Sequence, residues 1–266
     1  MSVTVERPVD GVARIVLDRP ERLNAMNYAV VRGLYDAFDD LGADRSCRAI
    51  ILTGAGRGFC AGLDLTEGAS PPDAGGLGRP QSGMRVQEFI AGLVPRMRAV
   101  PQPIIAAVNG AASGGGLALA LASDIRIAST SARFNVAFIR VGLSGCDIGV
   151  SWLLPRLVGA SRAFEMLLTG RMVDAAEADR IGLVSRVVPD AELEPAAQET
   201  ARLIVGNSPF GVRMTKEVMW SQLEVGSLRA GIDLENRTQI LASFTGDLVE
   251  AMAAFSEKRP PRFGDG

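Results

Sequence analysis

Two glycine-rich segments, each directly after a short apolar run, are the first candidates for a site that performs chemistry. GAGRGFCAGLDL spans residues 54–65 and follows the run that ends at Thr53, whereas GAASGGG spans residues 110–116 and follows the run that ends at Val108. Glycine lets backbone N–H groups approach a ligand without a side chain in the way. Two such turns can direct two amides at one carbonyl oxygen, and a helix that begins near Gly115 adds the positive end of its dipole.

Two other interpretations of these turns are tight chain packing and phosphate binding. The second segment does not fit G-x-G-x-x-G, and the chain shows no clear Walker pattern. The pattern therefore argues against a nucleotide site without identifying another ligand.

The absence of histidine from all 266 residues limits the chemistry that side chains can perform. It excludes nucleophilic mechanisms that pair Ser or Cys with His, and metal sites with His ligands. Proton transfer must use Asp, Glu, Tyr, Lys, Cys or water. The three cysteines, Cys47, Cys60 and Cys146, lack paired spacing, which indicates reduced thiols rather than a disulfide framework or a zinc site.

The elements that must position the two turns are short buried strands alternating with helices. Apolar runs predict strands at 12–17, 49–53, 104–108 and 124–128. Apolar side chains at helical spacing predict helices at 28–41, with Asn27 as N-cap, and at 84–100 and 115–122. Helical segments without a further strand follow at 191–205, 209–224, 227–242 and 245–256. We therefore predict an α/β core over residues 1–200 and a helical region over residues 201–266.

Composition and charge exclude several other classes of protein. The net charge is −2 and Lys and Arg are scattered, so the sequence predicts no surface for nucleic acid or an anionic membrane. No window approaches the ~20 apolar residues of a membrane span, and the N-terminal residues show no signal-peptide pattern. We expect a soluble cytoplasmic protein. Residues 66–83, rich in Gly, Pro and Ser, are either a flexible surface loop or a lid beside a pocket.

Taken in order along the chain, several segments resemble the enoyl-CoA hydratase/isomerase (crotonase) superfamily. They are RPERLNAMN (19–27), GAGRGFCAGLDL (54–65), PIIAAVNGAASGGGLALALASDIRIAS (103–129), FNVAFIRVGLSGCDIGVSWLLPRLVG (134–159), LTGRMVDAAEADRIGLVSRVV (168–188) and AFSEKRPPRF (254–263). They occur in the family's order and with its spacing over nearly the whole chain. Together, these segments therefore make the resemblance specific.

The resemblance implies a crotonase-like spiral of ββα units and a helical C-terminal region that assembles a homotrimer or a dimer of trimers. It implies an acyl-CoA thioester substrate with no separate cofactor. The oxyanion hole, which stabilises negative charge on the thioester oxygen, would be formed by the backbone N–H groups of Ala61 and Gly115. Further CoA contacts are implied at Arg22, Asn24, Ala25, Met26, Gly62, Leu63 and Asp64, and, from a neighbouring subunit, at Phe255 and Lys258. For Asp64 we favour a second role, in which its side chain holds the local turn.

The chain departs from the family at both glutamates of the hydratases. The position three residues after Gly115 holds Ala118, and the position four residues after Phe134 holds Phe138. Hydration requires an activated water and a proton delivered to the α-carbon. Because neither replacement transfers protons, the standard two-glutamate mechanism is not available.

One carboxylate, Asp147, remains in this neighbourhood. The stretch DIGVSWLLPRLVG that it begins resembles the segment after the catalytic aspartate in dienoyl-CoA isomerases and 3-hydroxyisobutyryl-CoA hydrolases of the superfamily. We expect Asp147 to act as general base or acid in an apolar pocket that contains Phe138. The alternative is that its side chain caps a helix that begins near Gly149. Glu67, Glu88 and Cys146 are weaker candidates.

The sequence thus predicts a lyase or isomerase acting on an acyl-CoA, with isomerisation favoured over hydration. Moving a double bond needs one base that takes and returns a proton, and Asp147 is one such group. Two alternatives stay open: a hydrolase in which Asp147 activates water, and an acyl-CoA-binding protein with little catalysis. The sequence does not identify the acyl group.

Overall fold

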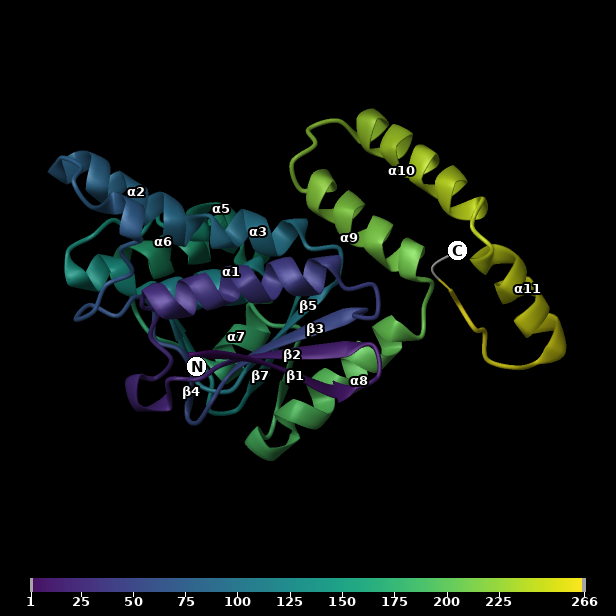
Figure 1. Cartoon of the computed structure of the whole chain (residues 1–266), viewed down its shortest axis with the longest axis horizontal. Helices are drawn as coiled ribbons and strands as arrows, with labels where there is room; N and C mark the ends of the chain where they lie inside the picture. The colour runs from purple at the N-terminus through teal and green to yellow at the C-terminus, as the bar shows by residue number, and fades with distance from the viewer. Residues whose placement is uncertain (1, 265–266) are drawn as a thin grey trace.

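A computed structural model describes residues 2–264 and shows two β-sheets between which the chain alternates (Figure 1). The larger sheet has the order β1 (Val3–Val9), β2 (Val12–Leu17), β3 (Ala49–Gly54), β5 (Ile104–Val108), β7 (Ile125–Ser129) and β10 (Arg186–Val188). The smaller sheet has the order β4 (Gly58–Cys60), β6 (Ala111–Ser113), β8 (Arg133–Asn135) and β9 (Val173–Asp174). Neighbouring strands run parallel except for β1 with β2 and β8 with β9.

Three times along the chain, a strand of the larger sheet is followed by a short strand of the smaller sheet and then by helices. The first unit, β3–β4, leads to α2 (Arg79–Ala91) and α3 (Leu93–Ala99), and the second, β5–β6, leads to α4 (Gly115–Ala122). The third unit, β7–β8, leads to the 3₁₀ segment η3 (Ala137–Val141), α5 (Val150–Val158) and α6 (Ala160–Thr169). This order confirms the predicted spiral of ββα units.

The central strands β3 and β5 are almost entirely apolar because helices cover both faces of the larger sheet (Figure 1). Side chains alternate between the faces, so Ile50 and Leu52 pack on the side of α1 (Tyr28–Ala43) and α3. Ile51 and Ile105 point the other way and pack against α8 (Leu193–Val205). The predicted strands and the α1 helix, with Asn27 as its N-cap, are confirmed.

The predicted helix over 84–100 is instead two helices, α2 and α3, and the first begins earlier, at Arg79. They meet at Gly92, where an added Cβ would lie 2.3 Å from the Tyr35 hydroxyl oxygen, so a larger residue there would displace the Tyr35 side chain. The remaining short elements are η1 (Pro20–Arg22), η2 (Pro72–Ala74), α7 (Ala175–Arg180) and η4 (Asp190–Glu192).

The C-terminal helices α9 (Pro209–Gln222), α10 (Leu228–Ser243) and α11 (Asp247–Glu257) extend from one side of the core (Figure 1). Each buries only one or two of its residues within the chain. The predicted division at residue 200 falls inside α8, which packs on the sheet. Within residues 2–264, no helix is both long enough and apolar enough to cross a bilayer.

Candidate active site

The two glycine-rich turns lie side by side at one end of the smaller sheet. The parallel strands β4 and β6 bring them there, with Gly58 opposite Ala111. Gly62 adopts a φ of +99°, and a Cβ added to it would lie 2.9 Å from the Ser113 carbonyl oxygen and 3.5 Å from the Gly115 amide nitrogen. Both the positive φ and the close approach require glycine. The sequence therefore brings the backbones of residues 62 and 115 into contact.

Two asparagine side chains hold the first turn in shape. Asn24 is fully buried, and its amide donates to the carbonyl oxygens of Ala55 at 2.9 Å and Gly58 at 2.7 Å. The amide of Asn109 donates to the carbonyl oxygens of Gly54 and Gly56, both at 2.9 Å. Asn109 was not predicted as a site residue, although its place directly after β5 is where a parallel strand delivers side chains to the site edge.

The backbone amides of the two turns are not equally available to a ligand. The Ala61 N–H donates to the Leu23 carbonyl oxygen at 2.9 Å, so the predicted oxyanion donor is already engaged. Within residues 2–264, the N–H groups of Leu63 and Gly115 have no acceptor. The Gly115 amide is also the first of α4, where N–H groups lack intrahelical partners and the helix dipole is positive.

Helix α4 is buried along its whole length, which explains its uniformly apolar sequence. An added Cβ on Gly116 would lie 2.0 Å from the Cys60 carbonyl oxygen, so α4 packs directly on the backbone of β4. Burial raises the pKa of the Cys60 thiol to about 12, and this thiol is inert at neutral pH. The hydratase glutamate position, Ala118, lies in the same helix and is fully buried.

Asp147 directly precedes Ile148, whose side chain lies against the second turn. Cδ1 of Ile148 is 3.5 Å from the position of an added Gly115 Cβ. The helix cap of α5 is Gly149 and no side chain caps it, so the alternative role of Asp147 as an N-cap does not describe the structure. The carboxylate oxygen Oδ1 accepts from the Ile148 N–H at 2.8 Å and from Nε2 of Gln87. Oδ2 has no partner within residues 2–264.

Phe138, at the second glutamate position, lies beside the same turn. Its ring atom Cε1 is 3.4 Å from where a Cβ on Gly114 would lie, and Gly114 has a φ of +51°. The ring is buried. The surroundings of the second turn are therefore apolar on the side of Phe138 and Ile148, with Asp147 at their edge.

A buried ion pair shapes the segment that follows the first turn. Nη1 of Arg19 lies 3.1 Å from Oδ2 of Asp64, and Nη2 lies 2.7 Å from Oε1 of Glu67. Oδ1 of Asp64 accepts from the Thr66 hydroxyl at 2.6 Å and from the Thr66 and Glu67 amides. These hydrogen bonds, that of the Thr66 hydroxyl first, hold the pKa of Asp64 far below its ordinary value. The turn-holding role predicted for Asp64 is confirmed, and Glu67 is part of the same network.

The sequence matches the family model for enoyl-CoA hydratase/isomerase over residues 8–266. The chain belongs to the enoyl-CoA hydratase/isomerase family. It is 46% identical to the Mycobacterium tuberculosis protein named "Probable enoyl-CoA hydratase EchA12", over 99% of this chain and 93% of that protein. It is 40% identical to the 1,2-epoxyphenylacetyl-CoA isomerase of Escherichia coli, over 95% of each.

A crystal structure of a probable enoyl-CoA hydratase/isomerase from Mycobacterium abscessus is also similar, with a TM-score of 0.94 and 43% identity. The match covers 100% of this chain and 99% of that one, which confirms the crotonase fold. The protein is therefore an enzyme of the hydratase/isomerase type, from a family that uses CoA thioester substrates. Relatives named hydratase and isomerase are both similar, so the family leaves the exact reaction open.

Some of the residues that the family resemblance implies as CoA contacts lie together in the structure, and others lie apart. The Met26 amide donates to the Gly62 carbonyl oxygen at 2.7 Å, which joins the segment of Arg22, Asn24 and Ala25 to the first turn. Phe255 and Lys258 lie at the end of α11. This helix belongs to the C-terminal arm, formed by α9, α10 and α11, which extends away from β4 (Figure 1). Within one protomer they are not part of this site.

Two of the three weaker candidates from the sequence, Glu88 and Cys146, make no polar contact with the residues of the candidate site within residues 2–264. Glu88 is exposed on α2 and lies 3.6 Å from Arg85. Cys146 is exposed, and its amide donates to the Ser144 hydroxyl at 3.1 Å.

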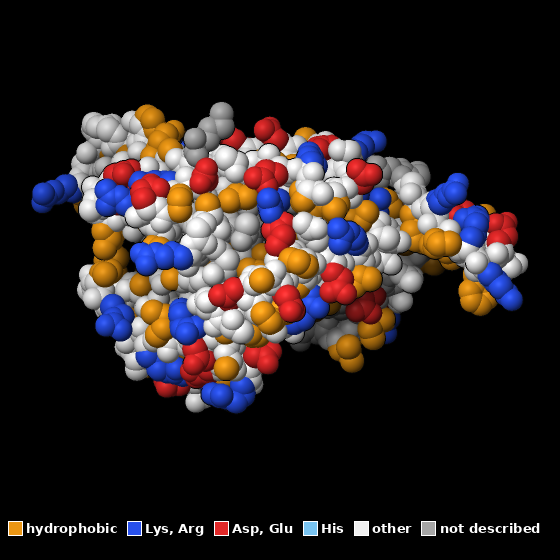
Figure 2. Space-filling model, turned by 90° about the horizontal axis from the view of Figure 1, so that it is seen from below, with side chains coloured by type: hydrophobic (Ala, Val, Ile, Leu, Met, Phe, Trp, Pro, Cys, Tyr) orange, Lys and Arg blue, Asp and Glu red, His pale blue; other side chains and the backbone are white. Residues whose placement is uncertain are grey.

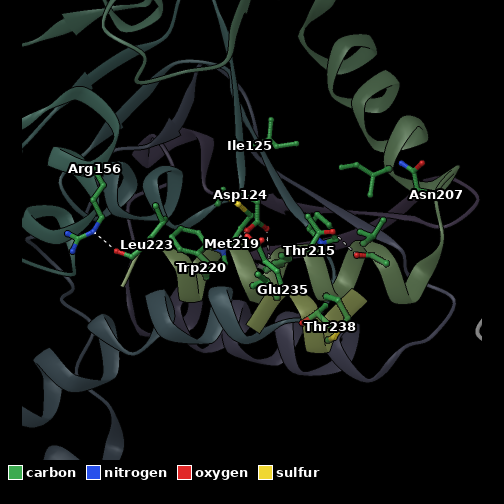
Figure 3. A pocket seen from close by; sticks show the side chains of 18 of the residues that line it. Asp124, Ile125, Arg156, Asn207, Thr215, Met219, Trp220, Leu223, Glu235 and Thr238 are labelled. Atoms are coloured by element: carbon green, nitrogen blue, oxygen red, sulfur yellow. Dashed lines mark hydrogen bonds and ion pairs between the residues drawn. The ribbon is translucent and has the colours of Figure 1, made fainter. Parts of the chain in front are cut away.

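A cavity of about 1000 Å³ lies at the other end of α4, between the core and the helices α9 and α10 (Figure 3). Its wall includes Asp124, whose carboxylate accepts from Nζ of Lys216 at 3.0 Å and from Nε1 of Trp220 at 2.7 Å. The guanidinium of Arg98 stacks between Trp152 and Trp220, at 5.0 and 4.4 Å from the ring centroids. The eight residues of α4, about 12 Å, separate this cavity from Gly115. The polar groups named here pair with one another or with aromatic rings, and the candidate active site remains the one at the glycine-rich turns.

Proposed function

We propose that this enzyme is an acyl-CoA isomerase that moves a double bond with one carboxylate. The observation that carries the proposal is the carboxylate of Asp147, whose Oδ2 has no partner within residues 2–264 and which directly precedes Ile148, the residue that lies against the second turn. The two positions that hold glutamates in the family's hydratases are the apolar residues Ala118 and Phe138. The similarity to a relative named as an epoxyphenylacetyl-CoA isomerase supports an isomerase reaction in general.

In the proposed reaction, Asp147 removes a proton from the carbon next to the double bond. The electron pair of the broken C–H bond moves into the conjugated system, and the thioester carbonyl becomes an enolate. The protonated Asp147 then returns the proton to the carbon at the other end of this system, which regenerates the carbonyl and shifts the double bond. No other reactant is consumed, which fits a site with one acid–base group.

We propose that the enolate oxygen is held by the N–H groups of Leu63 and Gly115 rather than of Ala61. The unused amides of residues 63 and 115, in segments whose backbones touch, support this choice. Donors fixed in advance stabilise developing charge strongly, and losing one costs about 3 kcal/mol in other enzymes. CoA would then lie along the segments around Met26 and Gly62.

We also propose a trimer, or a dimer of trimers, assembled through the C-terminal helices. Apolar side chains on α10 and α11 are exposed in the single chain, with Leu228, Phe244 and Phe255 more than 80% accessible. Figure 2 shows such side chains among charged ones at the end of the molecule formed by these helices. An assembly would cover them and bring Phe255 and Lys258 toward the CoA of a neighbouring subunit.

The test is to incubate a panel of short, long and aromatic enoyl-CoAs with the enzyme in deuterium oxide. Isomerisation is expected to move the double bond and to incorporate deuterium without releasing thiol. The Asp147→Asn variant is expected to lose about 10²- to 10⁴-fold in kcat, because the proton-transfer group is gone. Its affinity for CoA is expected to stay unchanged.

The matched control is Asp40→Asn, since Asp40 is exposed on α1 and has no ion pair within residues 2–264. Release of free CoA by the wild type would identify a hydrolase instead. Binding without turnover would identify a binding protein, and full activity of Asp147→Asn would remove Asp147 from the mechanism.

A further inference from the structure

The C-terminal end of helix α2 is held against α1 by aromatic contacts. The ring of Phe89 stacks on Tyr28 and Tyr35, with centroids 5.6 and 5.5 Å apart. The Tyr35 hydroxyl donates to the Phe89 carbonyl oxygen at 2.9 Å. These contacts hold the last two turns of α2 against α1. They therefore also hold the backbone of the residue two positions before Phe89.

That residue is Gln87, which reaches the carboxylate of Asp147 across 60 positions of sequence. An ionised carboxylate only accepts hydrogen bonds, so the amide nitrogen Nε2 must be the donor. The acceptor is Oδ1, which also accepts from the Ile148 N–H at 2.8 Å. Both hydrogen bonds therefore go to one oxygen and leave the other, Oδ2, facing no donor within residues 2–264.

We propose that Gln87 is a positioning residue that holds Asp147 with Oδ2 directed at the substrate proton. This inference rests on the proposed function of Asp147 as the base. The terminal torsion of Asp has a broad, two-fold energy profile, so two donors on Oδ1 remove a rotation that would otherwise exchange the oxygens. Misplacement of a reacting group by about 1 Å can cost 10²-fold in rate.

The chemical type of Gln87 suits this role. A neutral amide orients a carboxylate through a hydrogen bond, whereas Lys or Arg at the same place would add a full positive charge and weaken the base. The charged side chains of α2 near this contact are Arg85 and Glu88, which lie 3.6 Å apart, and Arg85 also pairs with Asp73. The exposed thiol of Cys146 precedes Asp147 in the chain. None of these groups is changed by substituting Gln87.

The first experiment compares Gln87→Leu with the wild type, using hex-3-enoyl-CoA as the probe. We expect kcat to fall roughly 10- to 100-fold with KM unchanged within about twofold. Gln81→Leu is the control, because Gln81 is exposed on the same helix and makes no hydrogen bond to Asp147. A rise in KM at unchanged kcat would mean that Gln87 binds substrate, and equal activity of both variants would mean that it positions nothing; either result overturns the proposal.

The second experiment does not depend on turnover. The carboxyl ¹³C signal of Asp147, assigned by its loss in Asp147→Asn, is titrated in the wild type, Gln87→Glu and Gln81→Glu. A carboxylate placed against Asp147 is expected to move its titration midpoint to higher pH by roughly one unit, and only in Gln87→Glu. In the plot of kcat against pH, the acidic limb of Gln87→Glu is expected to move to higher pH as well.

Together, the two experiments distinguish a failure of the positioning role of Gln87 from a failure of the proposed function. An unmoved midpoint in Gln87→Glu would show that the contact is absent and would overturn the inference. A moved midpoint together with full activity of Asp147→Asn would show that the contact exists but that the proposed base is wrong, which removes the positioning role with it.

Discussion

Asn24 and Asp64 are buried polar residues that make their hydrogen bonds within the protein. Asn24 accepts from the Arg19 N–H at 2.9 Å and donates to two carbonyl oxygens of the first turn. Asp64 pairs with Arg19 and accepts three hydrogen bonds from Thr66 and Glu67. Their side chains therefore shape the segments where we propose that CoA binds, rather than recognising it directly.

The network around Asp64 predicts a specific loss of stability in acid. The pKa of Asp64 is lowered in the folded protein, so this carboxylate stabilises the fold above the ordinary Asp value of about 4 and loses its effect as the pH falls toward its folded pKa. Asp64→Asn is expected to lower the Tm clearly at pH 7 and less at pH 3. Thermal unfolding across this range measures the difference, with Asp40→Asn as the control. An equal loss of Tm at both pH values would contradict the prediction.

The site was predictable from the sequence where it depends on local patterns. Glycines after apolar runs indicate Gly62 and Gly115, and the turn position of Asp64 indicates its hydrogen bonds. Which of the Ala61 and Leu63 amides lacks an acceptor was not predictable, because this depends on the Leu23 carbonyl lying opposite the Ala61 N–H. The contact of Gln87 with Asp147 was not predictable for the same reason, since it joins elements far apart in the chain.

At the scale of elements, the contact between α4 and β4 decides how closely the two turns approach. An added Cβ on Gly116 would lie 2.0 Å from a backbone oxygen, which cannot rotate away as a side chain can. Gly116→Ala is therefore expected to destabilise the protein by about 1–3 kcal/mol or more. Urea unfolding checks this value.

Gly83→Ala is the matched control, because Gly83 lies in α2 with nothing within 4 Å of the added Cβ. Alanine there is expected to be neutral or to stabilise the helix by up to about 1 kcal/mol. Equal stability of the two variants would show that α4 does not pack on β4 as described.

Length and burial explain which elements were predictable. The strands β2, β3 and β5 are apolar runs of five or six residues and were predicted within a residue of their bounds. The strands of the smaller sheet have two or three residues, too few to show an alternating pattern. The break between α2 and α3 was missed because Gly92 is needed for a tertiary contact with Tyr35.

For the molecule as a whole, the exposed apolar residues of α10 and α11 predict an assembled enzyme. Phe244→Glu is expected to shift the species measured by light scattering from a trimer or hexamer toward smaller forms, because a charge would be buried in the interface. The affinity for CoA is expected to fall in parallel if α11 of a neighbour contributes to binding.

Asn236→Glu provides the control, as Asn236 is an exposed polar residue of α10, the helix that Phe244 directly follows. It is expected to leave the assembly unchanged. A wild-type protein that is monomeric at micromolar concentration would exclude the proposed role of these helices.

The stack of Trp152, Arg98 and Trp220 has a consequence for optical measurements. These are the only two tryptophans of the chain, and they sit on α5 and α9 on either side of one guanidinium. Intrinsic fluorescence therefore reports whether α9 is seated against the core, and a denaturation curve followed in this way records the release of the C-terminal arm. The ligand site that we propose at Gly115 needs a different reporter, such as a tryptophan introduced beside Phe138.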